Sequence, residues 1–328
     1  MLKFTSEDCE MIYKPKTNII LRFIPNGLFI HLFFALVYFN SCTKDNIIVI
    51  GDNDPVSVTN ISRLKIENYV NRLFIDLIGR EPLKVELGPE VDTLKVKELS
   101  REARLDLINR LMDDTIFRPG ERSYKAAFNL NLYNLAKVRS LEAVTDEEIQ
   151  SEMGILISNA MRDSMDGKWD AFYAKLNQVR KFQNLLQSQN DLYFGDIQYH
   201  QVFTFMVDNA IYDVINMNTF NFIRSVYNEL LFRLPTDQEY GVAFEIIEKN
   251  IPGQVFGKYC SNRTEFINSL IESPAMSEGM VIWTFQVYLN RFPTARELAS
   301  VLDVYLAGKD IRNVIRQIAV TDEYASFK

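Results

Sequence analysis

The stretch LFIDLIGREP, residues 73–82, recurs twice further along the chain and determines the fold that we expect. The related stretches are VYNELLFRLP at residues 226–235 and TFQVYLNRFP at residues 284–293. Each copy has an aromatic residue six positions before an arginine, and apolar residues three and four positions after the aromatic one. This spacing places the apolar side chains on one face of a helix, so the chain repeats one buried helical pattern.

Each copy ends with an arginine and, two positions later, a proline. An arginine suits the negative end of a helix dipole, and a proline cannot continue a helix but suits the first turn of the next one. In two copies a threonine follows the proline and a glutamate lies three residues further on, which is typical of an N-terminal capping box. We expect the arginines to bind neighbouring carbonyls or acids, and an anion cluster is the weaker alternative. The turn residues are Arg80, Pro82, Arg233, Pro235, Arg291 and Pro293.

A second apolar ladder with helical period follows each copy, at residues 104–117, 263–276 and 312–324. The repeating unit is therefore helix, Arg-x-Pro turn, helix, connector and helix. Units of this kind cannot bury their apolar faces alone and must stack. We expect an all-α fold of stacked helical repeat units, with a helical insertion at 121–219. The units are expected at residues 61–120, 220–280 and 281–328.

The insertion at 121–219 is rich in aromatic residues. Thr145, which is followed by acids, and the run after Gly167 predict helices. Trp169, Phe172 and Tyr173 have the i, i+3, i+4 spacing of a helix face packed in the core, although aromatic side chains of this kind also serve as anchors for a partner.

Residues 190–201 are the least periodic part of the insertion and are expected to form a loop. Tyrosine and tryptophan on loops make rigid, amphipathic anchors for protein or sugar partners. The candidate partner-binding residues are therefore Tyr193, Phe194 and Tyr199. Packing within the protein is an equally good alternative for these three.

The N-terminal region is typical of an export signal. Residues 28–39 are apolar, too few for a membrane span of about 20 residues but sufficient for the core of a signal peptide. Lys14, Lys16 and Arg22 lie upstream, and acidic residues among the first ten make Met11 an alternative start. We expect a signal peptide at 1–41 and a tether at 42–60.

The segment Phe39-Asn40-Ser41-Cys42 resembles a bacterial lipobox in its relaxed, bacteroidete-type form. The resemblance implies cleavage before Cys42 and attachment of acyl chains such as palmitate, and several chains anchor a protein stably where one is marginal. The following Thr43-Lys44-Asp45-Asn46 loosely resembles signals that send such lipoproteins to the cell surface, so the surface face of the outer membrane is favoured over the periplasmic one. An ordinary secretory leader is the alternative.

The repeated motif also resembles two groups of exported bacterial helical modules. One accompanies cytochrome-type domains in planctomycete surface proteins, and the other lies beside S-layer and calcium-repeat segments, with LxGRxP as the common feature. Residues 77–82, LIGREP, match it in full, whereas Phe232 and Asn290 replace the glycine in the other copies. The resemblance implies an envelope module with no assigned reaction, and the missing Cys-x-x-Cys-His motif excludes covalent haem attachment.

Composition and candidate chemistry narrow the functional classes further. A net charge of −7 argues against nucleic-acid binding. Asp196 lies four residues before His200, but a catalytic triad that uses this histidine is a weaker hypothesis than an ordinary histidine on a loop. A calcium loop from Asp52 fails because its twelfth position is Arg63. Cys260 is expected to be a buried thiol, no carboxylate pair of glycosidase type stands out, and we expect no metal or cofactor.

These features favour an outer-membrane lipoprotein that acts as a non-catalytic accessory or scaffold subunit of an envelope complex for secretion, uptake or surface assembly. Its expected partners are membrane lipid through Cys42 and an outer-membrane or surface protein complex, with no nucleic acid. The alternative is a surface glycan-binding or glycan-processing lipoprotein whose loop aromatics stack on sugar rings.

Overall fold

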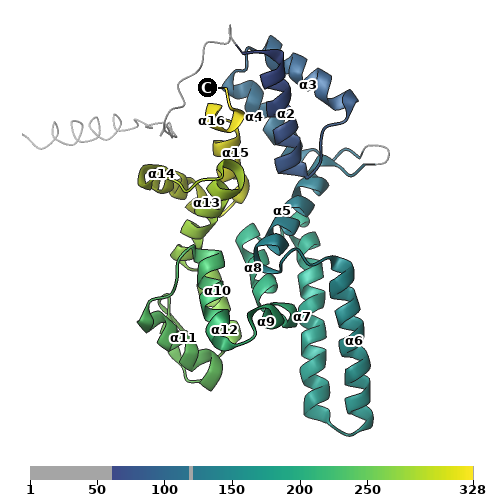
Figure 1. Ribbon diagram of the computed structural model, residues 1–328, viewed down its shortest axis with the longest axis vertical. Helices are drawn as coiled ribbons and strands as arrows, with labels where there is room; N and C mark the ends of the chain where they lie inside the picture. Colours follow the sequence, from purple (N-terminus) through teal and green to yellow (C-terminus); the bar gives the residue numbers. More distant parts are fainter. Residues whose placement is uncertain (1–60, 118–120, 328) are drawn as a thin grey trace, which may run out of the picture. The chain divides into compact units, whose positions relative to one another are not determined.

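The computed structural model describes residues 61–117 and 121–327. Within these ranges 75 % of the residues are helical and only two short strands occur, which confirms the predicted all-α fold of stacked helices (Figure 1). None of these helices has the length and apolar content needed to cross a membrane. The predicted signal peptide, Cys42 and the tether lie outside the described residues.

The elements are described in chain order, grouped by the units that we expect from the sequence. The first unit contains α2 (Arg63–Ile78), α3 (Lys84–Val96) and α4 (Arg101–Asp113). The insertion contains α5 (Tyr124–Ser140), α6 (Asp146–Met165), α7 (Trp169–Phe194), α8 (Tyr199–Val207) and α9 (Ala210–Asn216). The second unit contains α10 (Thr219–Leu231), α11 (Asp237–Lys249), β1 (Gly253–Val255), β2 (Lys258–Cys260) and α12 (Arg263–Ile271). The third contains α13 (Pro274–Leu289), α14 (Ala295–Leu306), α15 (Ile311–Ala319) and α16 (Asp322–Ala325). Helix α13 spans the predicted boundary between residues 280 and 281.

The repeated apolar face is buried in each unit. The aromatic residues Phe74, Tyr227 and Phe285 are each at most 1 % exposed. The helices that carry them, α2, α10 and α13, each pack on the helix that follows the Arg-x-Pro turn. The period of the sequence pattern therefore identified the core side of these helices.

The third unit packs against both other units. Its helix α15 contacts α4 and its α16 contacts α2, while α13 contacts α10. Arg104 and Asp322 form a buried ion pair of 2.8 Å between α4 and α16. The Tyr69 hydroxyl donates to the carbonyl of Ala319 at 3.0 Å. These contacts join the N-terminal unit to the C-terminal end of the chain.

Helices α10 and α13 meet backbone to backbone at Gly279. A Cβ atom at this position would lie 2.0 Å from the carbonyl oxygen of Leu230. Only glycine allows this approach, because a methyl group needs more than 3 Å from its neighbours. The contact explains why a glycine occupies the middle of a buried helix.

A short β-hairpin interrupts the second unit and was not foreseen from the sequence. Strands β1 and β2 are antiparallel, with Val255 opposite Lys258. The two residues between them, Phe256 and Gly257, both have positive φ values, of 48° and 81°. Two such residues are typical of a type I′ turn, which suits the twist of a hairpin.

Candidate functional site

The three Arg-x-Pro turns have one common geometry. In each, the arginine donates from both terminal nitrogens to one glutamate six residues later, at 2.6–3.0 Å. The same guanidinium also donates to the carbonyl of the next residue and lies 5.2–5.7 Å from the centre of the aromatic ring six residues before it. The glutamates are Glu86, Glu239 and Glu297. We call this arrangement the arginine clasp.

The clasp also begins the second helix of each unit. The glutamate accepts a hydrogen bond from the backbone N–H at the helix start, as the predicted capping box requires, at 2.7–2.8 Å. Thr236 and Thr294 complete the box with their hydroxyls, whereas the corresponding Leu83 has no side-chain acceptor. Bonds from Arg233 lower the pKa of Glu239 to about 2, against the opposing effect of burial.

The residue before each clasp arginine adopts the left-handed conformation. Gly79 has φ 76°, and its replacements Phe232 and Asn290 have φ 54° and 53°. This conformation ends the preceding helix, which is why glycine and asparagine are common there. Phenylalanine is unusual at such a position, and the Phe232 ring packs under Arg139 at 4.4 Å. Each clasp arginine therefore stabilises its own turn by binding the capping glutamate and the next carbonyl.

The candidate partner-binding aromatics line one cavity of about 270 Å³. The expected loop is largely helical, because α7 continues to Phe194 and ends at the left-handed Gly195, and α8 begins at Tyr199. Phe194 is 70 % exposed at the rim, while Tyr193 is half-buried. The prediction of an accessible Tyr199 is wrong, since this side chain is buried and its hydroxyl donates to the carbonyl of Leu132 at 3.1 Å.

The polar wall of this cavity comes from three helix starts. Lys125 and Asn129 belong to the first turns of α5, Gln198 precedes α8, and Asp310 and Arg312 flank the start of α15. Arg312 donates to Asp310 at 2.8–3.0 Å. The Lys125 ammonium lies 4.8 Å from the centre of the Tyr193 ring. We call this space the Tyr193 cavity.

The far end of the α6–α7 hairpin carries a second group of aromatic residues. The prediction of a core stripe here is wrong, since Trp169 is 54 % and Tyr173 63 % exposed. Both rings pack on the half-buried Phe172, with ring centres 5.9 and 5.1 Å away. The buried residues of α7 begin only at Val179, so the preceding turns of this helix have no neighbour that covers them completely.

His200 and Cys260 are both buried. His200 lies in helix α8 instead of the expected loop, with Nε2 3.5 Å from a carboxylate oxygen of Glu272. Burial lowers its pKa. Asp196 is exposed on the connection before α8, so the proposed spacing does not place it beside His200 on one helix face. The Cys260 thiol is buried, as expected, and burial raises its pKa. Within the described ranges, no group of three or more histidine, cysteine or acidic side chains is placed to hold a metal ion.

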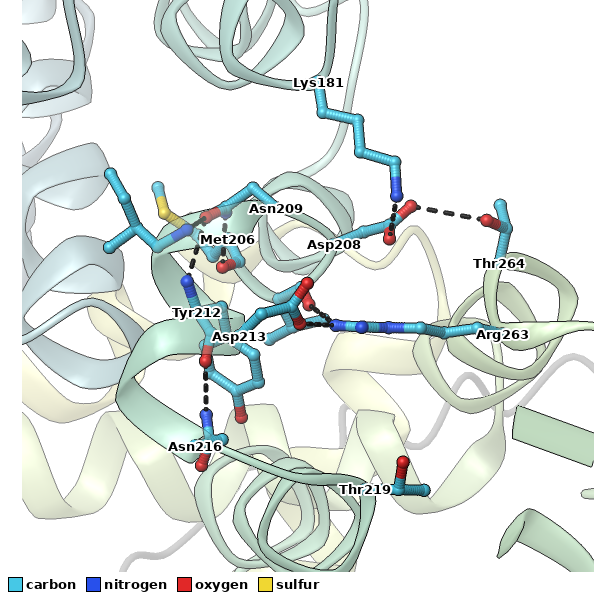
Figure 2. A network of polar contacts seen from close by, with 12 residues as sticks. Lys181, Met206, Asp208, Asn209, Tyr212, Asp213, Asn216, Thr219, Arg263 and Thr264 are labelled. Atoms are coloured by element: carbon cyan, nitrogen blue, oxygen red, sulfur yellow. Dashed lines mark hydrogen bonds and ion pairs between the residues drawn. The ribbon is translucent and has the colours of Figure 1, made fainter. Parts of the chain in front are cut away.

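A polar network joins the insertion to the second unit (Figure 2). Asp208 accepts from Lys181 at 2.6 Å and from Thr264 at 3.4 Å. Arg263 donates to Asp213 at 2.5 Å and stacks on the Phe222 ring at 4.0 Å. These partners are 27–56 residues apart in the sequence, so no local pattern could reveal the network.

Asn209 organises the centre of the same network (Figure 2). Its side-chain oxygen accepts from the first N–H groups of α9, while its amide nitrogen donates to the last carbonyls of α8. One buried side chain thus satisfies both helix ends at a sharp bend.

Glu229 of α10 is a partly buried carboxyl group in an open cavity of about 470 Å³. Its Oε2 accepts from the Tyr212 hydroxyl at 3.0 Å, and Arg139 donates to its backbone carbonyl at 2.9 Å. Burial raises the pKa of Glu229 to about 7, against the lowering effect of Tyr212 and Arg139. No pattern in the sequence distinguished this glutamate from others.

Comparison of the chain with known protein families, curated proteins and solved structures finds no match.

Proposed function

We propose that the protein is an outer-membrane lipoprotein that serves as a non-catalytic accessory or scaffold subunit of an envelope complex. In this proposal Cys42 carries the lipid anchor. The end of the α6–α7 hairpin binds the partner protein.

The exposed side chains at the end of the hairpin are the observation that carries this proposal. Met165 of α6 is 86 % exposed and lies close in sequence to Trp169 and Tyr173 of α7. Tryptophan, tyrosine and methionine are enriched in protein interfaces, where rigid aromatic side chains act as anchors. The far end of the hairpin projects beyond the other helices (Figure 1), whereas α7 also packs against α5 and α8.

The charges around this end are balanced within the hairpin. Lys175 of α7 pairs with Asp163 of α6, and Lys168 pairs with Asp166 at 2.8 Å. The other exposed charges here, Arg162 and Asp170, are opposite in sign. The end of the hairpin therefore has no net charge, and its aromatic and methionine side chains suit an apolar groove on a protein partner better than a charged polymer.

Photocrosslinking in the native outer membrane tests this proposal. A photoreactive residue replaces Tyr173, and a control places the same residue at Tyr259, which is 76 % exposed on β2. We expect one protein to be captured in stoichiometric amount from position 173 only, and the yield to fall at least tenfold with Trp169→Ser. Equal capture from both positions, or no capture from position 173, would refute the proposal.

The lipid anchor needs a separate test. Metabolic labelling with a palmitate analogue is expected to mark the wild-type protein and not Cys42→Ala, which should leave the membrane fraction. A labelled Cys42→Ala protein would contradict anchoring at this residue without affecting the hairpin experiment.

The Tyr193 cavity supports a second candidate function, glycan binding. Aromatic side chains, amides and charged groups converge there in a space of about 270 Å³, just below the range for small-molecule sites of roughly 300–1,000 Å³. Alanine at Tyr193 and Phe194 is expected to abolish retention on an immobilised polysaccharide. Tyr199 is unsuitable for this test because it is part of the core.

A further inference from the structure

Lys125 differs from the other lysines that lie over aromatic rings. Lys137, over Tyr133, also pairs with a carboxylate at 2.7 Å, and Lys249, over Phe244, pairs with one at 2.6 Å. Among the described residues, Lys125 has the Tyr193 ring and no carboxylate partner. A cation over a ring is held more weakly than a cation in a charge-assisted hydrogen bond. An anion that enters the cavity can therefore draw the ammonium to itself.

The other charges of the Tyr193 cavity leave this lysine uncompensated. Arg312 pairs with Asp310 through three side-chain hydrogen bonds, and Asp113, which lies 3.4 Å from Arg312, is bound by Arg316 at 3.0 Å. The described side chains that line the cavity carry no other carboxylate. The cavity thus has one net positive charge, at Lys125.

The helix N-termini around the Tyr193 cavity also favour a negatively charged ligand. The first turns of α5, α8 and α15 all contribute lining residues. The N-terminal end of a helix dipole favours negative charge. Asn129 and Gln198 supply amide groups, and Tyr193 and Phe194 supply apolar ring surface, which together suit a ligand with several hydroxyl groups and a carboxylate.

We propose that the Tyr193 cavity binds an acidic sugar unit of monosaccharide size, a hexuronate, and that Lys125 pairs with its carboxylate. This inference rests on the second candidate function and names its ligand class. The aromatic residues contact the sugar ring, and the lysine selects the charged sugar over the neutral one.

Two ligands that differ only in the carboxylate test the inference. Binding of methyl glucuronide and methyl glucoside is measured by calorimetry or NMR titration at low ionic strength. We expect the wild-type protein to bind the glucuronide at least tenfold more tightly than the glucoside. Lys125→Met keeps the apolar stem of the side chain and should abolish this difference.

A matched control separates the role of Lys125 from a general loss of positive charge. Lys249→Met removes a lysine that also lies over a ring, at 5.8 Å, but does not line the cavity. It should retain the preference for the glucuronide. Thermal unfolding of both variants shows whether each is folded, and Tyr193→Ala should weaken both ligands.

The outcomes distinguish the inference from the function on which it rests. Equal binding of the two sugars by the wild type would refute selection for an acidic unit and leave glycan binding in place. Binding of neither sugar would refute both. Acetate binding as tightly as the glucuronide would show a simple anion site and refute the sugar class.

Discussion

Replacement of Glu229 by glutamine is expected to change how the stability of the protein depends on pH. The carboxyl group lies between α9 and α10, where Tyr212 donates to it and Arg139 donates to nearby carbonyls. Burial raises its pKa from 4.5 to about 7, and the exposed Glu142 adds to the increase. The folded protein therefore binds a proton that the unfolded chain has already lost between these two pH values.

The size of the effect follows from this difference in pKa. The shift from 4.5 to about 7 is about 2.5 pH units, and each unit corresponds to about 1.36 kcal/mol. Proton binding by the folded state makes stability fall as pH rises through this window. Glu229 should thus lower the free energy of unfolding by up to about 3 kcal/mol at pH 8 relative to pH 4.

Urea unfolding of the wild type and of Glu229→Gln at several pH values measures this effect. Glutamine keeps the shape of the side chain and an acceptor for Tyr212 but cannot ionise. The variant should match the wild type near pH 4 and exceed its stability by up to about 3 kcal/mol at pH 8. Burial lowers the pKa of His200, which makes stability rise with pH. Both proteins contain His200, so this contribution cancels when their stabilities are compared.

A variant at an exposed position gives the control. Glu142→Gln removes a neighbouring carboxylate that contacts the same open cavity, and its effect on stability should stay small at every pH. A stability difference between wild type and Glu229→Gln that does not vary from pH 4 to pH 8 would refute the reasoning.

Three further predictions use unfolding free energies as the measurement. Gly279→Ala should cost about 3 kcal/mol, because its Cβ would meet the Leu230 carbonyl. Gly241→Ala in α11 has open space around the new Cβ and should gain up to about 1 kcal/mol. Equal effects of the two substitutions would contradict the close approach of α10 and α13. Arg291→Met should cost about 2–3 kcal/mol, since its partner Glu297 loses two charge-assisted bonds, and no loss would contradict the clasp. Leu83→Thr should stabilise the protein by about 0.5–1 kcal/mol by completing the capping box, and a destabilised variant would contradict it.

The features that could be predicted from the sequence are those that local spacing determines. The buried faces of α2, α10 and α13 follow from helical period, and the capping boxes follow from Thr-x-x-Glu. The acidic partner of each clasp arginine was expected only in general terms. The capping glutamate became its partner because a proline and a left-handed residue bring it within reach.

The candidate site depended on features that period alone cannot resolve. Trp169 and Tyr173 have the spacing of a core face, yet no other element covers that end of the hairpin completely. Period shows which side chains share a face, and only tertiary packing shows whether that face is covered. Tyr199 was misplaced for the opposite reason, because polar neighbours concealed the start of a buried helix. The ion pairs Lys181–Asp208 and Arg263–Asp213 join residues 27 and 50 positions apart, so local spacing could not predict them.

The three clasps show how one local device can serve different tertiary positions. The bidentate bond leaves the Nε atom of the arginine available. Arg80 uses it to pair with Glu121 before α5, at 3.1 Å, and Arg291 uses it to bind Glu323 of α16, at 2.6 Å. In Arg233 the same nitrogen has no carboxylate partner among the described residues. The clasp is specified within 13 residues of sequence, such as 74–86, whereas the partner of the arginine Nε atom depends on which element lies beside the turn. The repeat therefore specifies the turn, and the contact that each turn makes with a distant part of the chain differs from one copy to the next.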